Sequence, residues 1–370
     1  MKKIVFDARM YGLEHAGIGR YVMNLLKNFQ FSNSNFQISL LVKNERLKKI
    51  KAELGDRFKY IPARSKHYSL FEQFEIPFIL AKLNPDLVHF PHFNAPIFWN
   101  KNFVVTIHDL IKHYFTGMET TTRAKWLYMF KHWGYKIQVN HALYKSKLIF
   151  VPSQFWKDKL AADFNVNAEK ILVTPEATDD VYFNQEGKME KTYDLQPPYL
   201  IYTGSVYPHK NIKIVFEALQ EFPEIQLGIA CSRNVFTDRV EKNAIEMGLE
   251  DQVNFLGFVP DLDLKKLYQK AIALVQPSLM EGFGLTGLEA MSAGVPVIAA
   301  NSSCLPEVYG KGALYFNPDD KEDLIKRIKD LINDKDLRQR IIKQGTKQVN
   351  KFSWKKTAEL TFQGYQKALK

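Results

Sequence analysis

Short apolar segments alternate with longer segments of helical periodicity through the first half of the chain. Segments of strand length that are rich in Ile, Val and Leu predict five strands, at residues 3–7, 37–42, 87–90, 103–108 and 148–152. Apolar residues that recur every three or four positions predict helices between them, at residues 21–29, 71–83, 122–144 and 155–164. Because apolar strands separated by helices are typical of a parallel sheet covered on both faces, this half predicts a doubly wound α/β domain.

The alternation stops between residues 175 and 198, where acidic residues, Gly and Pro replace most apolar positions, and this predicts an interdomain connection. It then restarts, with strands predicted at residues 199–202, 226–230, 253–256, 273–276, 297–299 and 314–316. Helices are predicted between and after them, at residues 210–219, 238–247, 261–270, 285–292 and 321–333. We therefore expect two Rossmann-like domains, 1–178 and 195–353, followed by an amphipathic helix over 354–370. Ligands should bind at the carboxyl ends of the strands.

Composition agrees with a globular protein of two domains. The chain has 370 residues, of which 46% are hydrophobic and 25% charged, and it contains no apolar run long enough to span a membrane. Asp7 interrupts the apolar start of the chain, so residues 1–7 predict a first strand and not an export signal. Cys231 and Cys304 are far apart and lack metal-ligand spacing, which fits a reducing compartment and a cytoplasmic protein.

The most informative run is Glu-Gly-Phe-Gly-Leu at 281–285, followed by Glu289 and by Gly-Val-Pro-Val-Ile at 294–298. Two carboxylates stand eight positions apart across a glycine-rich loop and the start of a helix. Glycines allow a close approach of the backbone to a ligand, and a helix start offers N–H groups to an anion. A carboxylate for sugar hydroxyls beside a site for phosphate suits a sugar nucleotide. The alternative is an ordinary strand–turn–helix with two solvated glutamates.

This run resembles the E-x7-E signature of retaining glycosyltransferases of family 4. The resemblance implies the GT-B fold, in which two Rossmann-like domains face a central cleft and the C-terminal helix, here 354–370, crosses back onto the first domain. It also implies a hexosyltransferase that takes its sugar from a sugar nucleotide and needs no metal and no further cofactor.

The resemblance assigns donor-binding residues in the second half of the chain. Lys210, which follows Gly204 and Pro208, resembles the phosphate-binding lysine of the family, and Glu289 the glutamate that binds the ribose. Glu281 resembles the residue that contacts the transferred sugar. The implied donor-binding backbone includes Gly204, Ser205, Val259, Gly282, Phe283, Gly284, Leu285 and Thr286. Ser205 stands where many members have a phosphate-binding arginine. A solvated lysine and a buried strand end are the alternatives for Lys210 and Val259.

Two groups in the first half match the same family. The run Gly17-Ile18-Gly19-Arg20-Tyr21 follows the first strand, and we expect it to form a loop that caps the diphosphate, with Arg20 as a substitute for the missing arginine. A tight turn with positive φ is the alternative. His108 ends a strand, where the family often has a histidine beside the donor sugar; a structural histidine is the alternative. His89 and His92 are expected either to contact the acceptor or to be structural.

The family is described as reacting on a single face of the sugar, with the leaving phosphate helping to deprotonate the acceptor. Nothing in the sequence identifies a carboxylate nucleophile for a double displacement. We therefore expect Glu281 to orient the sugar, and Lys210 and His108 to assist as the other catalytic residues. Placed positive charge would neutralise the departing diphosphate.

Positive charge is concentrated in the first half of the chain. Residues 1–180 hold 26 Lys and Arg against 16 Asp and Glu, and no acidic residue lies between Glu119 and Asp158. Because no nucleic-acid-binding motif is present, we expect weak attraction to an anionic membrane, at the inner face of the cell membrane, and a glycan or lipid-linked acceptor. An aromatic stripe between Trp126 and Ile137 has helical spacing, and we expect it to pack in the domain core. The alternative is a basic helix that lies at an anionic membrane and presents the cleft to a lipid-linked acceptor.

The donor cannot be derived from the residues alone. The runs at 106–111, 208–211 and 303–308 look most like bacterial mannosyltransferases that use GDP-mannose in cell-surface polysaccharide synthesis. UDP-glucose and UDP-N-acetylglucosamine remain open as donors. A sugar-nucleotide epimerase, a phosphorylase and a non-enzymatic sugar-nucleotide sensor are the competing functions.

Overall fold

The chain divides into two compact units. The computed structural model describes residues 1–29, 36–117, 121, 125–179, 182, 187–233 and 235–370. Unit 1 comprises Met1–Leu110, Arg123–Glu176 and Trp354–Lys370, and unit 2 comprises Ile111–Thr122 and Ala177–Ser353. The expected first domain included residues 111–122, which group with unit 2 instead.

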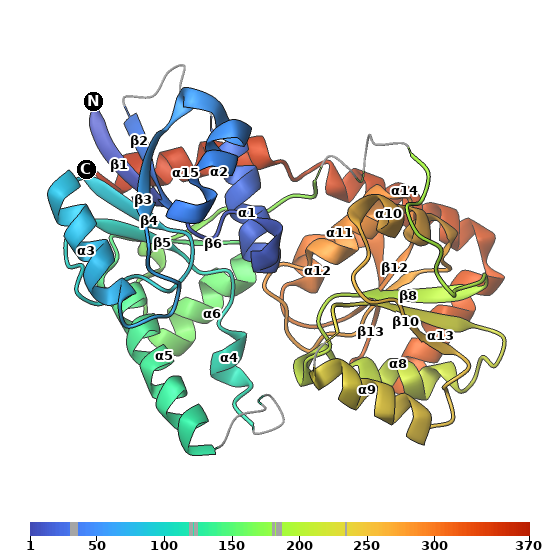
Figure 1. Ribbon diagram of the computed structural model, residues 1–370. Helices are drawn as coiled ribbons and strands as arrows, with labels where there is room; N and C mark the ends of the chain where they lie inside the picture. The colour runs from blue at the N-terminus through green and yellow to red at the C-terminus, as the bar shows by residue number, and fades with distance from the viewer. Residues whose placement is uncertain (30–35, 118–120, 122–124, 180–181, 183–186, 234) are drawn as a thin grey trace. The chain divides into compact units, whose positions relative to one another are not determined.

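Unit 1 is built on a seven-stranded parallel sheet in the order β3-β2-β1-β4-β5-β6-β7. Its strands are β1 (Lys2–Asp7), β2 (Phe36–Lys43), β3 (Lys59–Ala63), β4 (Leu87–Phe90), β5 (Phe103–Thr106), β6 (Leu148–Val151) and β7 (Ile171–Val173). Its helices are α1 (Ala16–Lys27), α2 (Leu47–Leu54), α3 (Glu72–Leu83), α5 (Lys125–Lys145), α6 (Gln154–Phe164) and α15 (Trp354–Ala368) (Figure 1). The order reverses between β1 and β4, which makes that point a binding position at the carboxyl edge.

Unit 2 is built on a six-stranded parallel sheet in the order β10-β9-β8-β11-β12-β13. Its strands are β8 (Tyr199–Thr203), β9 (Gln226–Ala230), β10 (Val253–Phe255), β11 (Leu274–Gln276), β12 (Val297–Ala300) and β13 (Ala313–Phe316). Its helices are α4 (Ile111–Tyr114), α8 (Ile212–Leu219), α9 (Val235–Glu246), α10 (Asp261–Lys270), α11 (Leu285–Ser292), α12 (Leu305–Tyr309), α13 (Lys321–Asn333) and α14 (Lys335–Val349). The order reverses between β8 and β11.

Short 3₁₀ turns complete the two units. In unit 1 they are Leu13–His15, Asn44–Arg46, Gly55–Arg57 and Ala168–Lys170, and in unit 2 they are Pro208–Lys210 and Gly310–Gly312. Side chains cap several helices: Ser153 accepts a hydrogen bond at the start of α6, and Asp320 and Asp334 do so for α13 and α14. These residues satisfy backbone N–H groups that the first turn of a helix leaves unpaired.

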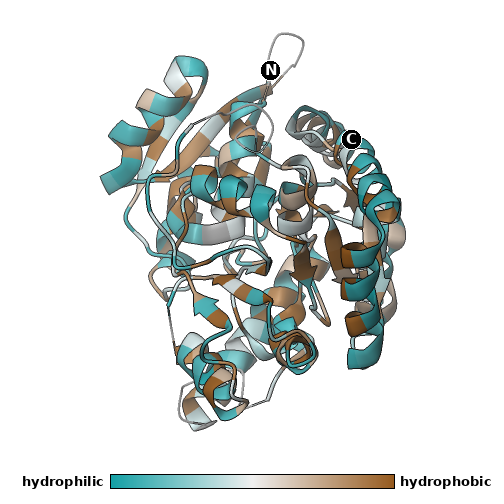
Figure 2. Cartoon of the chain, turned by 90° about the vertical axis from the view of Figure 1, so that its right-hand side faces the viewer, coloured by the Kyte–Doolittle hydropathy of each residue, from teal (hydrophilic) through white to brown (hydrophobic). Residues whose placement is uncertain are grey.

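The cores lie between the sheets and their helices. Central strands such as β4, β5 and β6 are buried along their whole length, as parallel strands covered on both faces must be. Figure 2 shows the strands predominantly brown, while most helices are banded brown and teal. The prediction of two doubly wound α/β domains is confirmed.

The C-terminal helix α15 belongs to unit 1, although it follows unit 2 in sequence. It packs against α1, and its Gly364 lies so close to Phe150 of β6 that a Cβ would overlap the ring. Tyr365 of the same helix is buried and hydrogen-bonds to His89, with 2.7 Å between Oη and Nδ1. The expected return of this helix to the first domain is therefore observed.

Candidate functional site in unit 2

The candidate donor residues of unit 2 gather where its strand order reverses. Strand β8 runs directly into Gly204, and the neighbouring strand β11 ends at Gln276. Gly204 has a φ of 127°, which favours glycine and turns the chain sharply after the strand. Because ligands of doubly wound domains bind beside the strand ends at such a reversal, this edge is the candidate site.

Lys210 and Glu281 meet at this edge. The Nζ atom of Lys210 lies 2.6 Å from Oε1 of Glu281, and both side chains are largely buried. The two loops are also joined by their backbones, because the N–H of Leu279 donates to the carbonyl of His209 at 2.8 Å. The resemblance assigned Lys210 to the phosphate and Glu281 to the transferred sugar of one donor, and in the structure the two side chains lie together and contact each other directly.

The local setting of Lys210 differs from the expectation in one respect. Lys210 was expected to open a helix, but it ends a 3₁₀ turn, and Asn211 follows in the left-handed conformation with a φ of 54°. Helix α8 starts only at Ile212. Lys210 therefore offers a point charge that precedes the helix and is not part of its first turn.

Glu281 is held by several donors besides the lysine. Its Oε1 atom accepts hydrogen bonds from Nε2 of Gln276 at 2.5 Å and from Oγ of Ser278 at 2.7 Å. Thr286 fixes the orientation of the Gln276 amide by donating to its Oε1 at 2.8 Å. Burial alone would raise the pKa of Glu281, but the charge of Lys210 and these hydrogen bonds lower it below its usual value. The carboxylate is thus kept ionised in a buried position.

Sequence reasoning missed these supporting residues. Gln276 ends an apolar strand, Ser278 belongs to a polar loop without a motif, and Ser303 begins the run at 303–308 but was assigned no contact with the site. Ser303 has a φ of 48°, and its Oγ accepts the N–H of Glu281 at 3.1 Å. The only signal in the sequence was a polar residue at the end of a buried strand, which is where a side chain reaches the edge of the sheet.

The glycine-rich loop has a packing function in addition to any contact with a ligand. Gly284 is the N-cap of α11 with a φ of 91°. A Cβ on either Gly284 or Gly287 would overlap the ring of Tyr309, whose hydroxyl donates to the Gly284 carbonyl at 2.7 Å. Phe283 is buried and packs edge-on against Phe352, with ring centroids 5.5 Å apart.

The remaining candidate residues of unit 2 lie at different distances from this centre along the sheet. Helix α11 spans Leu285–Ser292 as predicted, with Glu289 buried in its second turn. Gly282 is half-buried, and Ser205 accepts a hydrogen bond from Tyr202 through its carbonyl at 2.5 Å. Val259 is buried after β10, two strands away from β8.

His209, beside Lys210, is a further titratable residue of this edge. Burial, reinforced by the positive charge of Lys210, lowers the pKa of His209 to about 4. The ring is therefore neutral at physiological pH. It stacks on Tyr207, with centroids 6.0 Å apart, and lies 5.4 Å from the ring of Phe115.

Candidate residues in unit 1

The predicted glycine loop of unit 1 is not a loop. Gly17, Gly19 and Arg20 lie within the first turns of α1, and neither glycine has a positive φ, so the run forms neither the expected loop nor a tight turn with positive φ. A Cβ on Gly19 would overlap the carbonyl oxygen of Gly12, whereas a Cβ on Gly17 would meet no atom within 4 Å. Gly19 is thus required by packing, and Gly17 leaves open space beside a helix start that no side chain caps.

His108 is paired on both ring nitrogens. Its Nδ1 lies 2.8 Å from Oε1 of Glu176, and its Nε2 lies 3.0 Å from the carbonyl oxygen of Pro91. Burial would lower the pKa of His108, but Glu176 outweighs it and raises the pKa above the usual value. Since both partners accept hydrogen bonds, the ring is held as an imidazolium. Sequence reasoning found His108 and missed Glu176.

His89 is a structural residue. It is fully buried, its Nε2 lies 2.8 Å from Oγ1 of Thr106, and its Nδ1 is bound to Tyr365. Burial lowers the pKa of His89 to about 3, so the ring is neutral. His92 is in a different setting: its Nδ1 lies 3.1 Å from the hydroxyl of Tyr68, an exposed residue with a φ of 62°.

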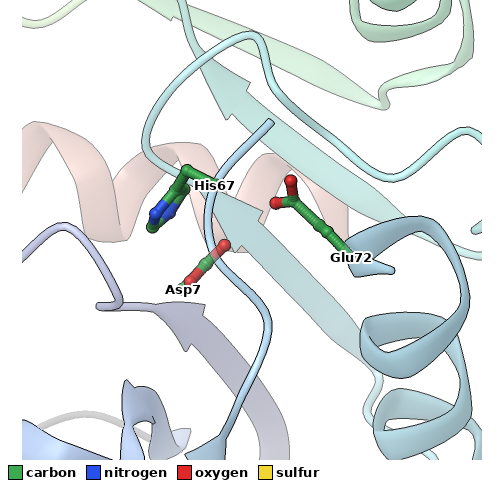
Figure 3. A group of neighbouring side chains, drawn as sticks. All are labelled: Asp7, His67 and Glu72. Atoms are coloured by element: carbon green, nitrogen blue, oxygen red, sulfur yellow. The ribbon is translucent and has the colours of Figure 1, made fainter. Parts of the chain in front are cut away.

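Figure 3 shows a group of three side chains of the kind that can bind a metal ion: Asp7 at the end of β1, Glu72 at the start of α3, and His67 in the loop from β3 to α3. Arg9, however, lies among them: its Nη2 is 2.6 Å from Oδ2 of Asp7 and 2.6 Å from Oε1 of Glu72. The guanidinium already supplies the positive charge that the carboxylates need. Burial lowers the pKa of His67 to about 3. The grouping therefore fits a buried structural ion cluster and does not fit a metal site.

Comparison with known proteins

Both halves of the chain match models of glycosyltransferase families. Residues 15–181 match the model described as Glycosyltransferase Family 4, and residues 184–348 match the model described as Glycosyl transferases group 1. The chain belongs to the family 4 glycosyltransferases. This glycosyltransferase is 28% identical to O-antigen chain mannosyltransferase B of Escherichia coli, over 98% of this chain and 99% of that protein. It is 30% identical to O-antigen chain mannosyltransferase RfbU of Salmonella typhimurium, over 67% and 65% of the two chains.

Solved structures identify the fold as GT-B. Sucrose-phosphate synthase from Thermosynechococcus elongatus superposes with a TM-score of 0.76 at 20% identity, covering 99% of this chain and 98% of that one. Anabaena HepE in complex with UDP-glucose gives a TM-score of 0.71 at 16% identity, covering 99% of each chain. Among the residues that the structure describes, none of the helices combines the length and the hydrophobicity needed to cross a lipid bilayer.

Proposed function

We propose that this glycosyltransferase transfers a mannosyl group from GDP-mannose to a glycan or lipid-linked acceptor in cell-surface polysaccharide synthesis, with retention of anomeric configuration. The pairing of Lys210 with Glu281 beside the β8–β11 reversal is the observation on which the proposal depends. The mannosyl donor rests on the relatives named as O-antigen mannosyltransferases. UDP-glucose, present in the HepE complex, is the alternative donor, with UDP-N-acetylglucosamine.

In this proposal the ion pair keeps the side chains of Lys210 and Glu281 in position while no donor is bound. A diphosphate brings negative charge to the Lys210 ammonium, which turns from the carboxylate to the phosphate. Glu281 is then released to accept hydrogen bonds from the hydroxyls of the sugar, while Gln276 and Ser278 keep it in place. Positive charge that is already positioned stabilises the leaving diphosphate without reorganisation, so the proposed reaction needs no metal ion.

The other candidate residues complete the proposed site. Glu289 would bind the ribose, and the backbone of residues 282–286 would bind sugar hydroxyls and phosphate oxygens. Arg20 on α1 remains the proposed substitute for the arginine missing at Ser205. His108 would add the fixed positive charge of its imidazolium. We propose that the reaction takes place in the cytoplasm, at the inner face of the membrane.

A panel of labelled sugar nucleotides tests the proposal. GDP-mannose, UDP-glucose and UDP-N-acetylglucosamine are incubated with the protein, with and without a crude lipid-linked acceptor. We expect slow release of free mannose without acceptor and a product of retained configuration with it. An epimerised nucleotide would indicate an epimerase, and phosphate-dependent formation of a sugar phosphate would indicate a phosphorylase. Donor binding without turnover would indicate a sensor, and each of these results would refute the proposal.

Two variants locate the chemistry. Glu281→Gln should lower turnover by about 100-fold or more while largely keeping nucleotide affinity, since it removes charge stabilisation at the sugar. Lys210→Met should lower both the turnover and the affinity for the nucleotide. Lys213 and Glu217 form an exposed ion pair on α8, so Lys213→Met and Glu217→Gln are matched controls that should behave as wild type. Wild-type turnover in Glu281→Gln would disprove the site assignment.

A further inference from the structure

Unit 1 exposes a stripe of large apolar side chains along the first half of α5. These residues recur at helical spacing and are each between 60% and 73% exposed: Trp126, Met129, Phe130 and Trp133. The expectation that this stripe packs in the core is therefore wrong. The core contacts of α5 come from its second half, where Val139, Ala142 and Leu143 are buried. In Figure 1 the first turns of α5 extend beyond the strands of unit 1.

A second exposed stripe lies on α3. Phe71, Phe74 and Phe78 stand on one side of the helix and are each between 57% and 63% exposed, while Ile76 and Leu80 on the other side are buried. An aromatic face is thus turned to solvent where a helix of this kind normally presents polar residues.

The two helices lie on the same side of the sheet. The crossovers β3–α3–β4 and β5–α5–β6 run in the same direction along the strand order, and right-handed crossovers in one direction cover one face. The loop between β4 and β5 contacts both helices. Its exposed Phe98 lies 5.2 Å from the ring of Phe74, and its Trp99 is close to His141 of α5.

Among the described residues, the exposed charges of α3 and α5 are positive, whereas Glu75 of α3 is half-buried and its carboxylate accepts the N–H groups of Arg64 and Ser65. No acidic residue occurs anywhere in α5, and Lys131 and Lys136 of this helix are exposed. On α3, the Nζ atom of Lys82 lies 4.2 Å from the centre of the Phe78 ring, so the cation and the apolar face are presented together. Tryptophan and lysine on one amphipathic surface are the combination that binds at the boundary between lipid headgroups and acyl chains.

We propose that the exposed faces of α3 and α5 dock unit 1 on the surface of a bilayer that contains anionic phospholipids. Aromatic side chains enter the boundary region, and the lysines bind the headgroup phosphates. A second copy of the chain fits less well, because a twofold interface would bring together two faces that both carry exposed lysines, and α5 has no acidic residue to pair with them. The docking itself does not depend on the donor chemistry; only its purpose, to meet a lipid-linked acceptor, rests on the proposed function.

Flotation of the full chain with vesicles tests the docking. Vesicles of phosphatidylcholine alone are compared with vesicles that contain about a third of phosphatidylglycerol, at low and high salt. We expect binding to the anionic vesicles only, weakened by salt because exposed charges are screened. Brominated lipids add a local readout: Trp126 and Trp133 are exposed and Trp99, Trp156 and Trp354 are buried, so quenching should come from the first two.

Variants assign the binding to the two faces. Trp126→Ser with Trp133→Ser, and separately Phe74→Ser with Phe78→Ser, should each lower the partition coefficient by at least about tenfold. Replacing Lys131 and Lys136 by Gln should lower it roughly fivefold per lysine. The matched controls lie in unit 2: Ile245→Ser removes an exposed apolar side chain, and Lys343→Gln removes an exposed charge. Neither should change binding.

Three results would overturn the proposal. They are equal binding to both vesicle types without salt dependence, wild-type binding by the stripe variants, and a lipid-free dimer that dissociates when the tryptophans of α5 are replaced. Turnover of sugar nucleotide is measured on the same variants without vesicles. Loss of docking with intact turnover concerns this inference alone, whereas failure of turnover in the wild type concerns the proposed function.

Discussion

The stabilisation that the Lys210–Glu281 ion pair gives to unit 2 can be measured with a double-mutant cycle. Lys210→Met removes the ammonium that lies 2.6 Å from the carboxylate and leaves the buried Glu281 hydrogen-bonded to the neutral donors Gln276 and Ser278. We expect a loss of about 3 kcal/mol, the lower end for breaking a buried pair, because the side chains of Lys210 and Glu281 retain 15% and 10% exposure.

Replacing Glu281 should destabilise the protein less than replacing Lys210. Glu281→Gln retains a hydrogen-bonding side chain, and the released lysine can turn toward solvent, so we expect a loss of about 1 kcal/mol. If the double variant loses about 1–2 kcal/mol, the coupling between the two residues is roughly 2–3 kcal/mol. The pKa of Glu281 is lowered in the folded chain, so this stabilisation is present above the unfolded value of 4.5 and is lost as pH falls through the folded pKa.

Urea unfolding near neutral pH provides the assay. All five tryptophans belong to unit 1, so tryptophan fluorescence follows unit 1 and far-ultraviolet circular dichroism follows both units. With an m-value of about 2 kcal/mol/M, Lys210→Met should lower the midpoint of the unit 2 transition by about 1.5 M. The exposed pair formed by Lys213 and Glu217 is the control, with an expected coupling below about 0.5 kcal/mol. A coupling equally small for Lys210 and Glu281 would refute the reasoning.

Three further predictions concern unit 1. The pKa of His108 is raised in the folded chain, so its stabilisation is complete below the unfolded value of 6.5 and is lost as pH rises through the folded pKa. His108→Gln should therefore flatten the fall in stability above neutral pH, and an unchanged slope would contradict this. Gly19→Ala should destabilise unit 1 by about 1–3 kcal/mol in urea unfolding, since its Cβ overlaps the Gly12 carbonyl. Gly17→Ala is its control and should be neutral or stabilising by up to about 1 kcal/mol. Arg9→Met should cost unit 1 about 3 kcal/mol or more by leaving two buried carboxylates unpaired, whereas a chelator should not change the tryptophan-detected midpoint. A lower midpoint with chelator would indicate a metal in that cluster.

Local patterns predicted most of the fold. Helices α10, α11 and α13 have the predicted bounds, because each combines regular apolar spacing with a clear start. Strand β3 was missed, since it lies at a sheet edge, contains Pro62 and has only one fully buried residue, and so lacks the apolar run of a central strand. Helix α14 was missed because only a few of its residues are buried.

The candidate site was only partly predictable. Lys210 and Glu281 were identified because they match sequence patterns of the family, and such patterns contain the side chains that the chemistry requires. Gln276 and Ser278 were not identified because no motif marks a polar residue there, although they stand only five and three positions before Glu281. Glu176 was not identified because it reaches His108 only when the ends of β5 and β7 lie at one edge of the sheet. The spacing of apolar residues along the sequence gives no signal for a contact between two such side chains.

The sequence by itself determined that the chain forms two α/β domains, and it identified a carboxylate and a lysine as candidates for binding a sugar nucleotide. Periodicity and motif depend on neighbouring residues, so both can be recognised without a structure. Only the tertiary structure decided which apolar stripe is covered. The stripe from Trp126 to Trp133 has the spacing of a core helix, yet it is exposed because α5 extends past the sheet that would bury it. A side chain is buried only where another element packs against it, and the tertiary structure determines where such packing occurs.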